Sequence, residues 1–214
     1  MEMFLKPAEE VVAAYVGLRI RTIELIRSCD QSVGDLPVPH CPTWSIRQLA
    51  AHMVGVPEDI LAGRLDGVTT EAWTQEQVDR HRNDSLLDLA TIWENMGAIF
   101  DPVLAGIPAP VNSQVVFDVA THEHDLRCAL GIPGARDAAS VAVSTGWILD
   151  AAERREQGSA NRLRNFGLDN FTLMRVFTGR RSRHQVEALG IDAGYIENWL
   201  STTPFSMAAV DIDE

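Results

Sequence analysis

The 214-residue sequence has little of several features that define whole classes of protein. Its three cysteines, Cys29, Cys41 and Cys128, offer no closely spaced pair, and an odd number cannot all pair with one another. No apolar run approaches the roughly 20 residues that cross a membrane, and the first residues lack the basic and apolar segments of a secretory leader. These absences predict a protein without disulfides or membrane spans, in the reducing cytoplasm.

Positive charge is also scarce, because 18 Lys and Arg residues stand against 30 Asp and Glu residues, for a net charge of -12. Such a chain repels phosphate backbones, so we expect no nucleic-acid partner. The basic residues gather at one place, the segment with Arg175, Arg180, Arg181 and Arg183. Arginines near helix ends bind backbone carbonyls and acidic neighbours, and we favour this structural interpretation over a binding patch.

The residues that are present favour helices. Apolar residues make up 46% of the chain, which is ample for a core. They recur with helical spacing in four long segments, and a shorter helix begins at Thr43 or Ser45 and is interrupted by Gly55 and Pro57. There is no convincing run of alternating strands and no internal repeat. The prediction is a mainly all-α fold, a helical bundle, with long helices over residues 7–28, 85–104, 113–130 and 138–156.

The character of the chain changes after Gly158. A polar stretch is followed by shorter helical segments, and Gly179 is placed to end one of them. We therefore expect a helical bundle over residues 1–158 and a C-terminal extension over residues 159–214 that packs on the bundle. The last four residues are acidic and are expected to be mobile.

Three polar residues stand out within apolar helical segments. Asp118 and His122 are spaced i, i+4, which places them on one face of a helix, and His52 lies in a second apolar segment. A single histidine in such a segment is usually a packed or capping residue, but three matching positions favour a divalent metal. Imidazole and carboxylate ligands suit zinc, nickel, copper or iron, and three protein ligands leave positions open for catalysis.

Two acidic residues flank this candidate site. Asp125 is three residues from His122, so its carboxylate could accept a hydrogen bond from that imidazole and support it from behind the metal. An ion pair of Asp125 with Arg127 or Arg136 is an equally good interpretation. Glu123 is expected to face solvent.

Several motifs, taken in order, resemble one known family. The segment 43–52, ending in His52, looks like its first metal motif, and the segment 122–131 looks like its second. Residues 177–189, with Pro204 and Phe205, are similar to a C-terminal signature of one subgroup. The chain resembles the mycothiol-dependent maleylpyruvate isomerase family of the DinB-like superfamily.

The resemblance implies an antiparallel four-helix bundle with a C-terminal extension, which is short here. It implies that His52, Asp118 and His122 bind a divalent metal, often zinc, although Asp118 stands where the family has glutamate and is one methylene shorter. The implied cosubstrate is mycothiol, drawn from solution because no cysteine sits convincingly in the site. Arg82 lies in a region that in relatives faces the mouth of the active site, where it could bind a substrate carboxylate; a solvent-exposed surface role is the stronger interpretation.

The resulting functional prediction is a metal-dependent enzyme that uses a low-molecular-weight thiol to attack a small electrophile. It would act as a thiol S-transferase or as a maleylpyruvate-type cis-trans isomerase. Two alternatives remain: a noncatalytic bundle that binds a small molecule or a protein partner, and a metal-dependent hydrolase. The exposed apolar faces of a bundle could also support a homodimer.

Overall fold

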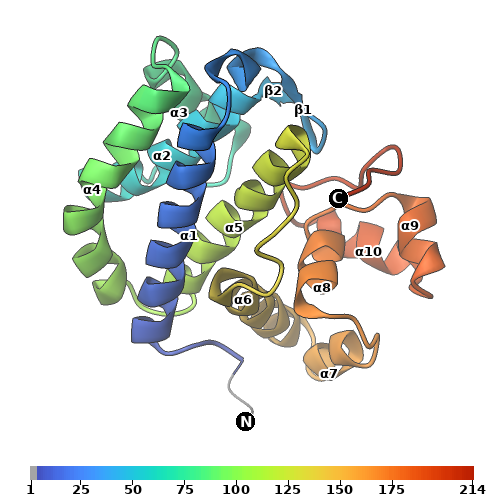
Figure 1. Cartoon of the computed structure of the whole chain (residues 1–214). Helices are drawn as coiled ribbons and strands as arrows, with labels where there is room; N and C mark the ends of the chain where they lie inside the picture. Colours follow the sequence, from blue (N-terminus) through green and yellow to red (C-terminus); the bar gives the residue numbers. More distant parts are fainter. Residues whose placement is uncertain (1–3) are drawn as a thin grey trace.

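The computed structural model describes residues 4–214, and within that range the fold is mainly all-α, as predicted (Figure 1). Ten α-helices account for most of it, together with one 3-10 helix and one two-stranded antiparallel sheet. In chain order the elements are α1 (Ala8–Ser28), η1 (Gln31–Asp35), β1 (Pro37–Val38), β2 (Cys41–Ser45), α2 (Ile46–Ala62), α3 (Glu71–Arg80), α4 (Leu86–Gly106), α5 (Val111–Leu130), α6 (Ala139–Arg155), α7 (Ser159–Arg164), α8 (Asn170–Phe177), α9 (Arg183–Ala188) and α10 (Ala193–Leu200).

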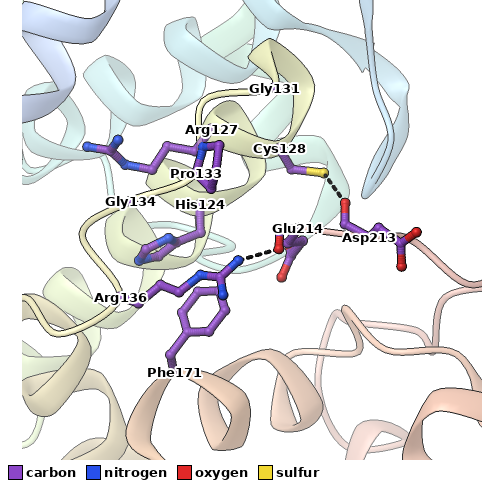
Figure 2. Close-up of a pocket in the computed structure, with 10 residues that line it drawn as sticks. All are labelled: His124, Arg127, Cys128, Gly131, Pro133, Gly134, Arg136, Phe171, Asp213 and Glu214. Carbon is purple, nitrogen blue, oxygen red and sulfur yellow. Dashed lines mark hydrogen bonds between the residues drawn. The ribbon is translucent and has the colours of Figure 1, made fainter.

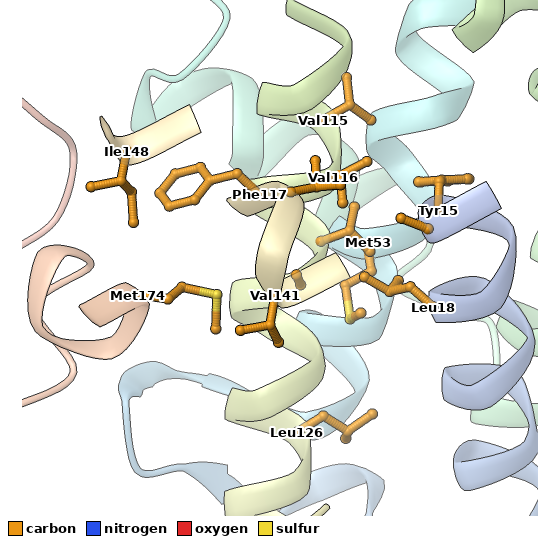
Figure 3. Packing of buried hydrophobic residues seen from close by; sticks show 14 of the residues in the cluster. Tyr15, Leu18, Met53, Val115, Val116, Phe117, Leu126, Val141, Ile148 and Met174 are labelled. Atoms are coloured by element: carbon orange, nitrogen blue, oxygen red, sulfur yellow. The ribbon is translucent and has the colours of Figure 1, made fainter. Parts of the chain in front are cut away.

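Four helices of the N-terminal part form the bundle. Helix α1 packs on α4 and α5, and α2 packs on the same two helices from the other side. Leu18 from α1, Met53 from α2 and Val116 from α5 lie together in the core between them (Figure 3). All three are fully buried, and each such side chain contributes about 1.5–3 kcal/mol to folding. This packing fixes the relative positions of α2 and α5, the two helices with the candidate metal ligands.

Helix α6 joins the bundle to the C-terminal part. It packs on α5 and α1 on one side and on α7 and α8 on the other. Figure 3 shows the apolar core continuing in this direction, with Phe117 of α5, Ile148 of α6 and Met174 of α8 close together. The C-terminal helices therefore pack on the bundle through a shared core.

Helix α2 begins where the sequence indicated, but it does not break at Gly55 and Pro57. Ser45 caps it in a capping box with Gln48, whose side chain accepts from the Ser45 N–H at 2.8 Å. The helix then runs unbroken through both residues. Because Gly55 has no side chain, α3 can approach closely: a Cβ there would lie 2.5 Å from the Gln77 Cβ. The glycine thus serves helix packing, and tertiary contacts outweigh its low helix propensity.

The C-terminal residues make defined contacts with the rest of the chain, which the sequence did not lead us to expect. Ala208 donates its N–H to the Gly179 carbonyl at 2.9 Å, and Gln185 donates to the Ile212 carbonyl at 3.1 Å. The Glu214 carboxylate lies among basic side chains. Acidic residues in this segment are ordered because the arginines of the C-terminal part bind them.

Among the residues described, none of the helices is both long and apolar enough to cross a membrane.

Candidate metal centre

Helices α2 and α5 bring together the three residues that the sequence singled out. His52 lies on α2, and Asp118 and His122 lie one turn apart on α5. Each offers one ligand atom, and these atoms lie within 4.8 Å of one another. The His52 Nε2 atom is 3.4 Å from Asp118 Oδ2, and the His122 Nε2 atom is 3.9 Å from Asp118 Oδ1. We call these three residues the metal-ligand cluster.

Both imidazoles are oriented by a partner on their other nitrogen. The His52 Nδ1 atom lies 2.7 Å from the Gln77 side-chain oxygen, and the His122 Nδ1 atom lies 3.1 Å from Asp125 Oδ2. An acceptor at Nδ1 favours the tautomer with the proton there, which leaves Nε2 as a free lone pair. Both free nitrogens therefore face the Asp118 carboxylate, the arrangement expected of metal ligands supported from behind.

The spacing of the cluster fits a small divalent ion. Two ligand atoms about 2.1 Å from a tetrahedral ion lie roughly 3.4 Å apart, close to the 3.4 Å and 3.9 Å separations in the cluster. Asp118 Oδ2 is buried and lacks a hydrogen-bond partner, although a buried carboxylate oxygen normally has one. The Asp118 side chain is 30% exposed, whereas the His52 side chain is 3% exposed. A ligand could thus reach the cluster from solvent past Asp118.

The charges within the cluster depend on one another. Burial on its own would lower the pKa of His52, but the Asp118 carboxylate and the bond to Gln77 outweigh it and raise that pKa. Burial would raise the pKa of Asp118, yet His52, His122 and Arg180 lower it. Burial lowers the pKa of His122. The carboxylate is therefore ionised and His122 neutral near neutral pH, whereas the raised pKa of His52 favours its protonated form, so a metal would bind with release of that proton.

Gln77 was not predicted from the sequence. It is fully buried on α3, and its amide nitrogen donates to Asp59 at 2.7 Å while its oxygen faces His52. Asp59 in turn accepts from Arg64 and Arg80, each at 2.7 Å. This chain of bonds fixes which way the Gln77 amide points. The only sequence feature that reflects the burial of Gln77 is Gly55, which allows α3 to approach α2 closely. That glycine was interpreted as a helix break.

Asp125 lies behind His122, as the sequence suggested, but its arginine partners were predicted wrongly. It binds Arg175 at 2.8 Å and Arg180 at 2.7 Å, rather than Arg127 or Arg136. These contacts hold the pKa of Asp125 well below its usual range despite its burial. Both arginines belong to the C-terminal part, so it is this part of the chain that completes the support of His122.

The expectation that Glu123 faces solvent was wrong. Its side chain is fully buried and is bound by Arg21 of α1 and Arg127 of α5, each at 2.9 Å. The two guanidinium groups compensate the buried charge.

A cysteine does lie beside the site, on the far side of His122. The Cys41 sulfur is 3.6 Å from Asp125 Oδ2 and 3.6 Å from an Arg180 nitrogen. Burial raises the pKa of Cys41 to about 12, so the thiol is protonated and a poor nucleophile. Cys41, His122 and Asp125 are close enough to bind an ion, but the arginines on Asp125 would repel a cation.

A further group of ligand-type side chains is disfavoured for the same reason. His40, Cys128 and Glu214 have ligand atoms within 4.8 Å of one another. The Glu214 carboxylate, however, is already bound by Arg175 and by Arg181 at 2.8 Å, and His40 lies 2.7 Å from it. Of the three groups among the described residues, the metal-ligand cluster alone has an unsatisfied anionic atom.

Three further residues lie on β2 and directly after α3, next to elements that hold the cluster in place. Arg82 follows α3 and is exposed, and no hydrogen bond or ion pair among the described residues joins its side chain to the cluster. His81 is bound between Glu58 at 2.9 Å and Asp84 at 2.8 Å, which accounts for its raised pKa. The half-buried Trp44 ring lies 5.2 Å from the His52 ring, centroid to centroid, so it forms one wall of the site.

No protein-family model, curated protein or solved structure gives a significant match to this chain. The likeness of its motifs to the mycothiol-dependent family therefore stays a prediction.

Proposed function

We propose that this protein binds a divalent metal, zinc or a similar ion such as nickel, through His52, Asp118 and His122. We further propose that the site activates a low-molecular-weight thiol for attack on a small electrophile. The reaction would be an S-transfer, or a cis-trans isomerisation by reversible addition of the thiol to a double bond. Mycothiol is the proposed thiol.

One observation carries the metal proposal. Two buried histidines present Nε2 atoms to a carboxylate oxygen that has no hydrogen-bond partner, while their Nδ1 atoms are already fixed by Gln77 and Asp125. The His52 Nε2 atom is 3.4 Å from this oxygen but makes no hydrogen bond of good geometry to it, whereas a purely structural pair would make one. Three ligands from the protein also leave coordination positions free for a substrate, as in catalytic metal sites.

The residues around the cluster have separate roles in this proposal. A bound divalent ion would lower the pKa of a coordinated thiol and so supply a nucleophile at neutral pH. Gln77 and Asp125 hold the two imidazoles in the orientation that binds the ion. Asp118 lies where solvent reaches the cluster, and Trp44 limits the space beside His52.

The choice of a thiol depends on the resemblance and on the state of the cysteines. Cys41 is protonated and faces the Nδ1 side of His122, so it does not compete for the open side of the cluster. The nucleophile would have to come from solution. The order of the motifs around His52, His122 and Phe177 favours mycothiol over other thiols.

Metal content is the first test. Elemental mass spectrometry on untagged protein should find about one divalent ion per chain, and His52→Ala and His122→Ala should each lose it. The matched control is His184→Ala, because His184 is exposed and far from α2 and α5 in the sequence. Replacement by Co²⁺ should give the visible absorption of a tetrahedral site. Metal-free protein that cannot be reloaded would refute the proposal and favour a noncatalytic binding module.

Turnover separates the proposed thiol chemistry from hydrolysis. The metal-loaded protein should consume maleylpyruvate or a reactive alkyl electrophile only when mycothiol is added, and Asp118→Asn should lose both metal and turnover. Reaction at the same rate without any thiol would instead identify a metal-dependent hydrolase.

A further inference from the structure

A cavity lies at the C-terminal end of α5, away from the metal-ligand cluster. It has a volume of about 90 Å³ and is lined by residues of α5, the following loop, α8 and the end of the chain. Figure 2 shows the His124 ring between Arg127 on one side and Arg136 and Phe171 on the other. A water molecule occupies about 30 Å³ in the liquid, so the cavity could hold about three waters or one small organic molecule.

His124 presents an unsatisfied polar atom in this cavity. Its Nε2 atom is buried without a hydrogen-bond partner, and the residue is 3% exposed. A buried unpaired nitrogen costs about 1–3 kcal/mol unless a ligand or water satisfies it.

Arg127 and Arg136 of the cavity wall offer hydrogen-bond donors to an anion. Arg127 binds Glu123 through Nε and Nη2, which leaves Nη1 directed toward Gly134 of the cavity wall. The Arg136 guanidinium lies over the Phe171 ring, 4.9 Å from its centroid, and donates to the Glu214 main-chain oxygen. Each arginine thus keeps donor capacity beyond the bonds it makes.

The adjoining residues indicate which anion fits. Arg175 binds the Glu214 carboxylate through two nitrogens, and Arg181 adds a third bond at 2.8 Å. These two guanidinium groups are therefore occupied, and Arg127 and Arg136 are the arginines that line the cavity. Phe171 and Pro133 supply apolar walls, which suit the short carbon chain of an organic acid better than a fully polar phosphate.

We propose that this cavity binds the carboxylate group of a small organic acid, held by Arg136 and by the Nε2 of His124. The carboxylate would accept hydrogen bonds from both groups, and the carbon chain would lie against Phe171. The site is separate from the metal-ligand cluster, because His124 and His122 are two residues apart on α5 and point to different sides.

Direct binding tests this proposal without metal or turnover, so its failure would leave the proposed function untouched. Acetate and propionate would be titrated into ¹⁵N-labelled full-length protein at constant ionic strength, with chloride as the reference. We expect saturable shifts of the His124 imidazole nitrogens and of amides at 131–136. Benzoate should bind more weakly, because its ring exceeds the cavity.

Two variants and one control define the site. Arg136→Gln should weaken acetate binding at least tenfold, as expected for the loss of a charge-assisted hydrogen bond, and His124→Phe should weaken it severalfold. Arg162→Gln is the control, because Arg162 also lies over a ring, 5.7 Å from the Tyr195 centroid, but outside the cavity; it should bind acetate normally. Equal binding of acetate and chloride, tighter binding of phosphate, or full affinity in Arg136→Gln would each overturn the proposal.

Discussion

Two groups of charged side chains lie on opposite sides of His122. On its Nε2 side is the metal-ligand cluster, where Asp118 has an oxygen without a hydrogen-bond partner. On its Nδ1 side is an arginine cluster, which we define as Asp125, Glu214 and the arginines at 175, 180 and 181. The metal-ligand cluster could therefore accept a positive ion, whereas the arginine cluster already contains the positive charge that compensates its carboxylates.

The difference shows why proximity alone does not make a metal site. Both groups contain histidine and carboxylate atoms close enough to bind an ion. In the arginine cluster every carboxylate is compensated by guanidinium groups, so a cation would enter against like charges. In the metal-ligand cluster two Nε2 atoms face a carboxylate oxygen that, among the described residues, has no hydrogen-bond partner and no ion pair with a guanidinium, so a cation could enter. Charge balance, more than residue type, separates a binding site from a structural network.

The largest expected effect comes from breaking the arginine cluster. Arg175→Met removes a fully buried guanidinium that binds both Asp125 and Glu214. Two buried carboxylates would lose compensation, and we expect the free energy of unfolding to fall by about 3–5 kcal/mol in urea denaturation. Arg154→Met is the matched control, since Arg154 forms an exposed pair with Asp150. A loss below about 1 kcal/mol for Arg175→Met would contradict the role assigned to the cluster.

In the metal-ligand cluster, removing a residue that orients a ligand should lower the affinity for metal. Gln77→Leu removes the acceptor that orients His52, and the affinity for a divalent metal should fall about 10–100-fold in a competition titration with a chelator. Gln75→Leu, on the exposed side of the same helix, should leave affinity unchanged. Unaltered affinity in folded Gln77→Leu would mean that Gln77 only fills space.

The sequence predicted the parts of this comparison that depend on local spacing. The i, i+4 spacing of Asp118 and His122 and the ending of α5 at Gly131 follow from helix geometry. Gln77 and the tail were missed because their roles arise only when distant segments pack together. From the sequence alone, Gln77 cannot be told from a polar residue of an exposed helix, because its burial depends on the close packing of α3 on α2 at Gly55.

The arginine partners of Asp125 were predicted wrongly for the same reason. Arg127 and Arg136 are near it in the sequence, whereas Arg175 and Arg180 reach it from α8 and the residues after it. The basic segment was correctly interpreted as a helix end paired with acidic residues. The pairing of this segment with Asp125 of α5 could not be predicted, because it depends on how α6 packs on α5 and on α8.

Acid should weaken the arginine cluster through Glu214. Burial would raise the pKa of Glu214, but His40, Arg175 and Arg181 together hold it well below its ordinary 4.5. Folding therefore stabilises the ionised form, and this contribution is complete above pH 4.5 and lost as pH falls below it. The stability difference between wild type and Glu214→Gln should shrink by about 1.4 kcal/mol per pH unit below 4.5. Urea titrations at pH 7, 4 and 3 would check this, and a constant difference would contradict it.

The smallest effect is expected where charge pairs face solvent. Arg183 binds Glu197 at 2.5 Å and Glu187 at 3.3 Å, as many carboxylates as Arg175 binds, but its side chain is 55% exposed. Water screens such pairs and holding long side chains costs entropy, so Arg183→Gln should change the free energy of unfolding by less than about 1 kcal/mol. The change should shrink further in 1 M salt. A loss as large as that of Arg175→Met would show that burial is not what distinguishes the arginine cluster, because number of partners alone would then account for both results.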